Sequence, residues 1–224
     1  LASIRAAAGS LRDPALDWSP DEVRSVAELI DQEAGRLDRL VANLLDLGRI
    51  EAGSLTTELR PFSLGDLVRD ALEAFESGLE GRPVEVAIPD DLPPVLVDER
   101  LASHILGNLV ENAIRHTPPG TAIRIAAREA AGEGLVRLVV EDAGPGVPER
   151  TLDRLFDKFY RVEPRAPGRR GSGIGLAVVR GFVEALGGRV VARRSELGGL
   201  AVVVDLPVAA PPVPTGRAEA VAER

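Results

Sequence analysis

The chain contains no cysteine, a single lysine and few aromatic residues, which make up 3% of its 224 positions. Without cysteine it can form no disulfide, no thiolate metal site and no cysteine nucleophile. No apolar run approaches the roughly 20 residues that a membrane-spanning helix needs, and no secretory signal pattern opens the sequence. The lack of cysteine is compatible with a reducing cytosol.

The charge balance argues against nucleic-acid binding. Acidic residues outnumber basic ones, and the formal net charge is -8. Such a chain repels nucleic-acid phosphates unless it carries a local basic patch, so we expect no nucleic-acid partner. Hydrophobic residues at 45% and charged residues at 28% are ordinary for a soluble globular protein. The length suffices for one full domain and a smaller one.

Residues 1–54 are predicted to form a helical hairpin. Ser19 suits the N-cap of the second helix, Pro20 its first position, and Glu22 completes a capping box. One short first helix cannot cover the apolar stripe of the second, so we expect an antiparallel hairpin that dimerises into a four-helix bundle. The alternative is that the stripe packs within the chain, on the second domain. The stripe alternates steps of four and three and consists of Val23, Ala27, Ile30, Ala34, Leu37, Val41 and Leu44.

Residues 62–208 are predicted to form a domain of mixed α and β structure, after a link through Pro61. The strands come mostly in adjacent pairs rather than in strand–helix–strand alternation, which favours an α+β sandwich with a mixed sheet. The Pro/Ala-rich residues 209–224 are predicted to be a disordered tail. Helices are expected at 64–79, 99–116, 148–155 and 174–186, and strands at 84–88, 95–97, 121–128, 135–141, 189–194 and 200–206.

The helix predicted at residues 99–116 carries polar side chains on one face. Asn108 and Asn112 are four residues apart and share a face, with Glu111 and Arg115 beside them. Two amides, a carboxylate and a cation can bind a hydrated magnesium ion and phosphate oxygens. Taken alone, the same pattern also fits a solvated polar face.

Asp142 leaves a predicted strand into a turn that contains Gly144 and Gly146. Its carboxylate could accept a hydrogen bond from an exocyclic amine such as that of adenine. Glycines let the backbone approach a ligand closely. The alternative is an ordinary Asp/Gly turn, and such turns are common.

A cluster of aromatic residues precedes a basic loop. Phe156, Phe159 and Tyr160 stand with Lys158 and Arg161, and three further arginines follow by residue 170. A hydrophobic anchor attached to a basic loop is what a lid over a polyphosphate requires. A surface loop with solvated arginines would have the same composition.

Glycines at the end of that loop open the next predicted helix. Gly171, Gly173 and Gly175, with Ile174 and Leu176, place free N–H groups at a helix N-terminus, where the dipole favours anions. A dinucleotide-binding fingerprint needs glycine in place of Leu176 and should follow a strand. A phosphate-binding Walker loop needs Gly-Lys-Ser/Thr, and the one lysine lacks that context. We therefore reject both interpretations.

The order of these motifs is more specific than any one of them. Asn-x-x-x-Asn, Asp-x-Gly-x-Gly, Phe-x-x-Phe and Gly-x-Gly-x-Gly-Leu follow one another between residues 108 and 176. This order resembles the N, G1, F and G2 boxes of two-component sensor histidine kinases, which share an ATPase superfamily with gyrase, Hsp90 and MutL. Gly198-Gly199 resembles the last and weakest box. Details such as Pro118-Pro119-Gly120 are similar to the potassium-sensing, KdpD-type branch.

The resemblance implies a role for each position. Asn112 would coordinate magnesium, Glu111 would act as the catalytic general base, and Asp142 would bind adenine. ATP and Mg²⁺ are the implied cofactors. The other implied ATP-binding residues are Asn108, Arg115, His116, Gly144, Gly146, Lys158, Tyr160, Arg161, Gly171, Gly173, Ile174, Gly175 and Leu176.

The implied reaction moves the γ-phosphoryl group of ATP to a histidine and then to an aspartate of a response regulator. Neither histidine of this chain suits the acceptor role, because His116 lies in the nucleotide-binding helix and His104, on the same helix, is expected to be structural. The acceptor motif of the family would lie immediately before residue 1. We therefore expect a fragment that binds ATP but does not phosphorylate itself.

The resemblance also implies partners: a response-regulator receiver domain and a second copy of the hairpin. Membrane contact is expected only through N-terminal regions of a parent protein anchored in the bacterial inner membrane. Two other functions compete with the kinase. A docking module indifferent to ATP is disfavoured because the nucleotide boxes are filled, and an ATPase that performs conformational work is disfavoured by the heptad hairpin.

Overall fold

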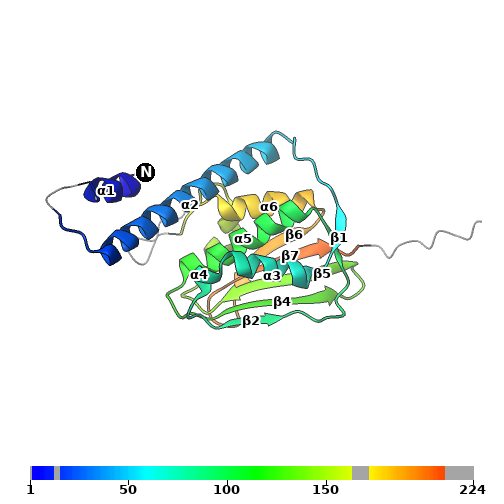
Figure 1. Ribbon diagram of the computed structural model, residues 1–224. Helices are drawn as coiled ribbons and strands as arrows, with labels where there is room; N and C mark the ends of the chain where they lie inside the picture. Colours follow the sequence, from blue (N-terminus) through cyan, green and yellow to red (C-terminus); the bar gives the residue numbers. More distant parts are fainter. Residues whose placement is uncertain (1, 13–15, 163–171, 210–224) are drawn as a thin grey trace, which may run out of the picture. The chain divides into compact units, whose positions relative to one another are not determined.

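The computed structural model describes residues 2–12, 16–162 and 172–209 (Figure 1). The chain divides into two compact units: Leu1–Leu55 with Arg154–Gly181, and Thr56–Asp153 with Phe182–Arg224. No helix in the described ranges is long and apolar enough to cross a membrane. The domain boundaries expected at residues 1–54, 62–208 and 209–224 stay predictions.

The first unit contains the two helices α1 (Ala2–Ser10) and α2 (Pro20–Glu51), which run in opposite directions (Figure 1). The indole nitrogen of Trp18 donates to the carbonyl of Ser10 at 3.1 Å, so the residue just before the N-cap of α2 is bonded to the end of α1. The predicted capping box is present. The Ser19 hydroxyl accepts from the Glu22 N–H, and the Glu22 carboxylate accepts from the Ser19 N–H at 2.9 Å.

The apolar stripe of α2 is exposed at several of its predicted positions. Val23, Val41 and Leu44 are 41%, 50% and 54% exposed. Near the carboxyl end of the helix the environment changes, because Leu47 is buried and Ile50 lies against Gly181 in the same unit. The exposed part of the stripe is the surface that the hairpin prediction assigns to a partner.

The second unit contains a five-stranded sheet in the order β2-β4-β5-β7-β6. β2 pairs with β4 in parallel and all other neighbours are antiparallel. The sheet is therefore mixed, as predicted. The strands are β2 (Val84–Ala87), β4 (Ile123–Ala130), β5 (Leu135–Asp142), β6 (Arg189–Arg194) and β7 (Leu200–Pro207).

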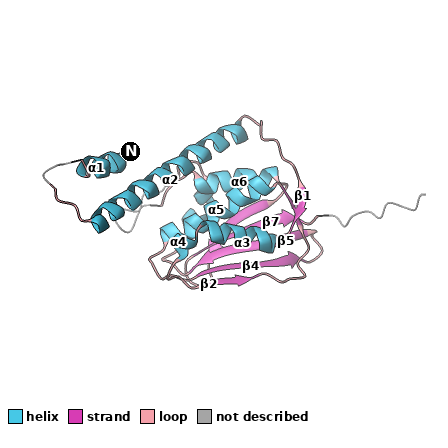
Figure 2. Ribbon diagram, in the orientation of Figure 1, coloured by secondary structure: helices cyan, strands magenta, loops and turns pink. Residues whose placement is uncertain are grey.

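Helices α3 (Leu64–Ala74) and α5 (Glu99–His116) pack over one face of this sheet (Figures 1 and 2). Leu101, Ile105 and Leu109 of α5 are at most 2% exposed. Burial of each such side chain contributes roughly 1.5–3 kcal/mol. The apolar side of α5 therefore packs into the core of the second unit.

Two local predictions are wrong. The link around Pro61 contains a strand, β1 (Arg60–Phe62), which forms a separate antiparallel pair with β3 (Val95–Val97). The helix expected at 64–79 breaks at Phe75, whose φ of -115° is not helical, and continues as α4 (Glu76–Leu79).

The segment expected to be helical at 148–155 is a 3-10 helix, η1 (Glu149–Phe156). It is eight residues long and follows Pro148, which cannot donate a backbone hydrogen bond. Helix α6 (Gly175–Ala185) lies within one residue of the bounds expected for it, residues 174–186.

Candidate functional site

The helix α5 is anchored at its start by Asp98. The Asp98 carboxylate accepts from the N–H of Leu101 at 3.1 Å, as an N-cap, and from the N–H of Glu58 at 2.9 Å. Burial opposes ionisation of Asp98, but these backbone hydrogen bonds and the charge of Arg100 lower its pKa. The ionised cap also complements the positive end of the helix dipole.

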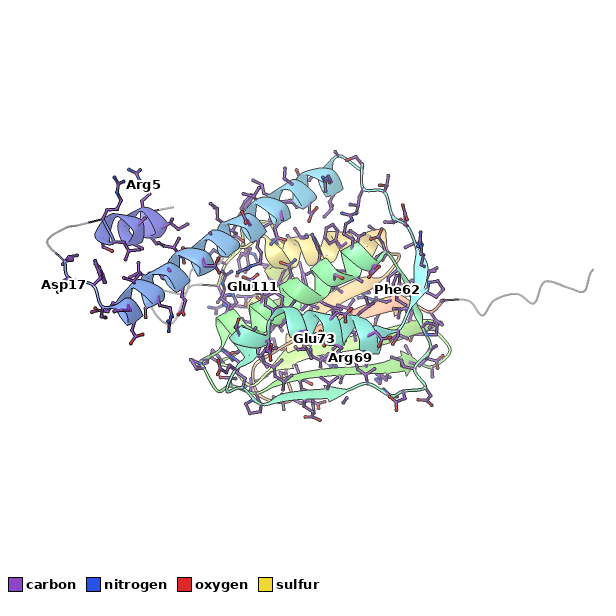
Figure 3. All side chains as sticks on the ribbon, viewed as in Figure 1. Arg5, Asp17, Phe62, Arg69, Glu73 and Glu111 are labelled. Carbon is purple, nitrogen blue, oxygen red and sulfur yellow. The ribbon has the colours of Figure 1, made fainter. Side chains whose placement is uncertain are left out.

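The polar face of α5 carries the predicted Asn108, Glu111, Asn112 and Arg115, all half-buried. Glu111 is labelled on this helix in Figure 3. The Arg115 guanidinium lies 3.6 Å from the Glu111 carboxylate. His116, at the last position of the helix, is exposed. The structure therefore places these five predicted residues together on one helix.

The opposite face of α5 is apolar, as expected. Leu109, Val110 and Ala113 are buried, although Ile114 is only half-buried. The His104 ring packs against Phe182 at a centroid distance of 5.9 Å. This contact agrees with the structural role expected of His104.

Asp142 is the most informative residue of the site. It is 5% exposed, and its Oδ1 accepts from the N–H of Gly144 at 2.8 Å and from that of Leu200 at 3.4 Å. Its Oδ2 has no hydrogen-bond partner among the residues that the structure describes. Burial raises the pKa of Asp142. A buried carboxylate oxygen without a donor is costly, and an exocyclic amine would supply that donor.

The glycines after Asp142 are required by packing. A Cβ atom on Gly144 would lie 2.6 Å from the Thr117 methyl group and 2.7 Å from Oδ1 of Asp142. Gly146 has a φ of +61°, and a Cβ there would lie 3.2 Å from the carbonyl oxygen of Gly199. Gly199 in turn donates to the carbonyl of Asp142 at 3.1 Å. The weak Gly198-Gly199 motif thus lies directly against the Asp142 turn.

The first unit holds the predicted lid residues. The N–H of Phe159 donates to the carbonyl of Gly173 at 2.9 Å, and the Arg154 guanidinium stacks over the Tyr160 ring at 4.2 Å. Lys158 forms an ion pair with Glu51 of α2. The backbone on either side of the loop is therefore joined at its base.

The remaining predicted lid residues occupy the segment that leads into α6. Gly173 has a φ of +70°. Ile174 is buried, and its N–H donates to the Ser172 hydroxyl at 3.2 Å. Gly175 and Leu176 begin α6 and are half-buried, and Arg161 is exposed. Gly171 lies outside the described residues.

The predicted site residues thus form two groups. Those from Asn108 to Gly146 lie in the second unit, and those from Lys158 to Leu176 lie in the first. Within the second unit, Thr117 lies directly after α5 and contacts Gly144, so it joins the end of the helix to the Asp142 turn. Sequence reasoning missed Thr117 and Arg82, which donates to it.

The donor set for a divalent cation is sparse. Among the described residues, no three histidine, aspartate or glutamate side chains group to hold a metal ion. The Asn112 amide oxygen and the Glu111 carboxylate are hard oxygen donors on one helix face, and magnesium is commonly held by one or two such groups together with phosphate oxygens and water. These residues therefore fit a magnesium ion that arrives with a nucleotide.

Comparison with known families agrees with this geometry. Residues 97–210 match the model of the histidine kinase-, DNA gyrase B-, and HSP90-like ATPases. The chain belongs to this ATPase family. Residues 1–53 match the His Kinase A (phospho-acceptor) domain. The two segments together are those of the signal-transducing kinase core of sensor histidine kinases.

Individual relatives support the same assignment. The chain is 36% identical to sensor protein KdpD of Mycobacterium tuberculosis over 212 residues, which are 92% of this chain and 24% of the relative. It is 33% identical to the histidine-protein kinase BaeS of Escherichia coli, over 93% of this chain and 44% of the relative. It thus spans less than half of each. Because the two identities are similar, the KdpD-type branch stays a prediction.

A solved kinase structure shows the same fold. The structure of full-length ShkA in complex with AMPPNP superposes with a TM-score of 0.69 at 27% identity, over 89% of this chain and 42% of that one. The helical N-terminal segment and the mixed-sheet domain of this ATPase family are therefore both present in the chain.

Proposed function

We propose that the chain is the ATP-binding kinase core of a two-component sensor histidine kinase. The observation that carries the proposal is the buried Asp142 carboxylate, whose Oδ2 lacks a donor in the described part of the chain while Oδ1 is held by two backbone N–H groups. The amine of adenine would donate to Oδ2. The Gly144 and Gly146 backbone would lie beside the base.

The polar face of α5 would bind the phosphates. Asn108, Arg115 and His116 supply amide, guanidinium and imidazole donors, and Asn112 would hold magnesium through its amide oxygen. Bound magnesium would offset the charge of the triphosphate. Catalysis would then rest on positioning and on neutralisation of negative charge.

Glu111 would serve as the general base. A histidine ring nitrogen would attack the γ-phosphorus, the bond to the ADP oxygen would break, and Glu111 would accept the proton of the imidazole. Its neighbour Arg115, whose guanidinium lies 3.6 Å from the carboxylate, would hold that carboxylate in place. The phosphoryl group would pass afterwards to an aspartate of a receiver domain.

The lid residues of the first unit would cover the triphosphate. Tyr160 and Arg161 would approach the phosphates, and the N–H groups at the start of α6 would face them. Lys158 would join them once it leaves Glu51, its ion-pair partner in the structure. The other members of this set are Gly171, Gly173, Ile174, Gly175 and Leu176.

The hairpin would supply the partners. We infer that the exposed stripe of Val23, Val41 and Leu44 is covered by the hairpin of a second copy, which gives a four-helix bundle. The same bundle would dock the receiver domain of a response regulator. The core would work on the cytoplasmic side, with any membrane anchor in N-terminal regions of the parent protein.

Nucleotide binding and phosphotransfer test the proposal separately. The 224-residue chain should bind Mg-ATP but take up no label from γ-labelled ATP, and it should label a supplied bundle domain that carries an acceptor histidine. Asn112→Ala should abolish the Mg-dependent part of binding. Absence of ATP binding, with no effect of this substitution, would contradict the proposal, and sustained ATP turnover without phosphotransfer would favour a non-kinase ATPase.

A further inference from the structure

Arg82 lies in the turn between α4 and β2 and contacts the carboxyl end of α5. Its guanidinium donates to the Thr117 hydroxyl at 2.6 Å and to the carbonyl of Ile114 at 3.0 Å. A third, longer contact reaches the carbonyl of Thr117 at 3.4 Å. The last carbonyls of a helix have no partner within the helix, and a cation there also complements the helix dipole. Arg82 therefore caps the helix that carries the phosphate-binding face.

Thr117 transmits this constraint to the adenine side of the site. It is 1% exposed, and its hydroxyl both accepts from Arg82 and donates to the carbonyl of Ala113 at 2.7 Å. These two bonds fix the side-chain rotamer. In that rotamer the methyl group lies so close to Gly144 that a Cβ there would be 2.6 Å from it.

Gly144 in turn orients Asp142. Its N–H donates to Oδ1 of Asp142 at 2.8 Å, and Oδ2 has no donor among the described residues. A shift of Gly144 toward Thr117 would lengthen this bond and rotate the carboxylate. The contacts thus form one continuous path from Arg82 through Thr117 and Gly144 to Asp142, all within the second unit.

We propose that Arg82 is a positioning residue for base recognition, which sets the orientation of Asp142 through Thr117 and Gly144. The inference rests on the proposed function, because it requires that Asp142 accepts from the amine of adenine. Arg82 touches neither the base nor the phosphates in this assignment. Its effect should therefore be specific to nucleotides that carry the amine.

A comparison of two nucleotides tests this. Inosine triphosphate has the same triphosphate and ribose as ATP but an oxygen in place of the exocyclic amine, so it cannot donate to Asp142 there. Dissociation constants for both should be measured by titration calorimetry with the full chain and with Arg82→Ala. We expect Arg82→Ala to weaken the affinity for ATP about tenfold, as loss of one hydrogen bond to a charged group does. The affinity for inosine triphosphate should change less than twofold.

Two threonine variants separate the steps of the path. Thr117→Ser keeps the hydroxyl bonded to Arg82 but loses the methyl group that supports Gly144, and Thr117→Val keeps a methyl group but loses both hydrogen bonds. Both should narrow the preference for ATP over inosine triphosphate. Arg82→Lys should keep more of the preference for ATP than Arg82→Ala does, because lysine can still donate to Thr117. Arg69→Ala, on the exposed side of α3, is the matched arginine control and should leave both constants unchanged.

The outcomes distinguish this inference from the proposed function. If the unsubstituted chain binds ATP no more tightly than inosine triphosphate, adenine recognition through Asp142 is wrong, and the inference fails with it. If the unsubstituted chain discriminates but Arg82→Ala weakens both nucleotides equally, or neither, the proposed function stands and Arg82 is merely structural. A lowered melting temperature alone does not mimic the expected result, because unfolding would affect both nucleotides alike.

Discussion

Glu141 and Asp142 are consecutive in β5, yet their buried carboxylates have opposite pKa shifts. Successive side chains of a strand point to opposite faces. Burial would raise the pKa of Glu141, but hydrogen bonds from Ser195 at 2.7 Å and from Arg124 at 2.8 Å lower it. Asp142 has only backbone donors, on Oδ1, and burial raises its pKa. The Glu141 carboxylate thus has side-chain donors on both oxygens, whereas the described residues supply donors to only one oxygen of Asp142.

Asp142→Asn should weaken ATP binding about tenfold to a hundredfold, because an amide nitrogen or oxygen cannot replace the charged acceptor and such a bond contributes roughly 1.5–3 kcal/mol. Titration calorimetry with Mg-ATP measures the effect. Glu141→Gln is the matched control in the same strand and should keep the affinity within about twofold. An equal loss of ATP affinity in both variants would contradict the proposal that Asp142 binds adenine.

Glu141→Gln should instead lower the free energy of unfolding by about 1–3 kcal/mol, because it breaks a buried, charge-assisted contact with Arg124. The folded pKa of Glu141 is lowered, so its stabilisation is present above the unfolded value of about 4.3 and is lost as the pH falls through the folded pKa. Urea unfolding from pH 7 down to pH 3 should show the two proteins converging at low pH. Asp142 is common to both, so its own contribution cancels. A difference that is independent of pH would refute this explanation.

Gly199→Ala should prevent stable folding of the Asp142 turn, because a Cβ there would overlap the carboxylate and the carbonyl of Asp142. The melting temperature should fall by several degrees and ATP affinity should be lost. Gly132→Ala provides the contrast. Gly132 has a positive φ, +79°, but nothing lies within 4 Å of its Cβ position, so the cost should be limited to the backbone strain of about 1 kcal/mol. A wild-type melting curve for Gly199→Ala would show that the close packing is wrong.

Leu44→Glu should dissociate the proposed dimer, because it places a charge in the exposed apolar stripe of α2. Analytical ultracentrifugation over a concentration series measures the change. Ala42→Glu adds the same charge two residues away on an exposed position outside the stripe and should leave the association intact. ATP binding should persist in both variants. A monomeric unsubstituted chain at all concentrations would rule out the hairpin as a dimer interface.

Local patterns predicted much of the fold. The capping box at Ser19 and Glu22 and the helix α5 at Glu99–His116 are confirmed, because caps and apolar periodicity act over a few residues. The predictions failed where distant segments decide. The strand β1 forms because it pairs with β3, which lies more than 30 residues further along the chain. The helix expected at 64–79 breaks at Phe75, whose ring lies against Gly107 of α5.

The same division holds for the site. The sequence alone determined the order and spacing of the motifs and predicted which residues form the nucleotide boxes, since those motifs are short and contiguous. Only the tertiary structure decided that one buried oxygen of Asp142 lacks a partner among the described residues. It also decided that the Thr117 methyl group leaves no room for a Cβ atom at position 144, and that Arg82 donates to Thr117. The hydrogen bonds Arg82–Thr117 and Leu200–Asp142 join residues 35 and 58 positions apart. Such contacts form only when the sheet and α5 pack together, and no local pattern encodes them.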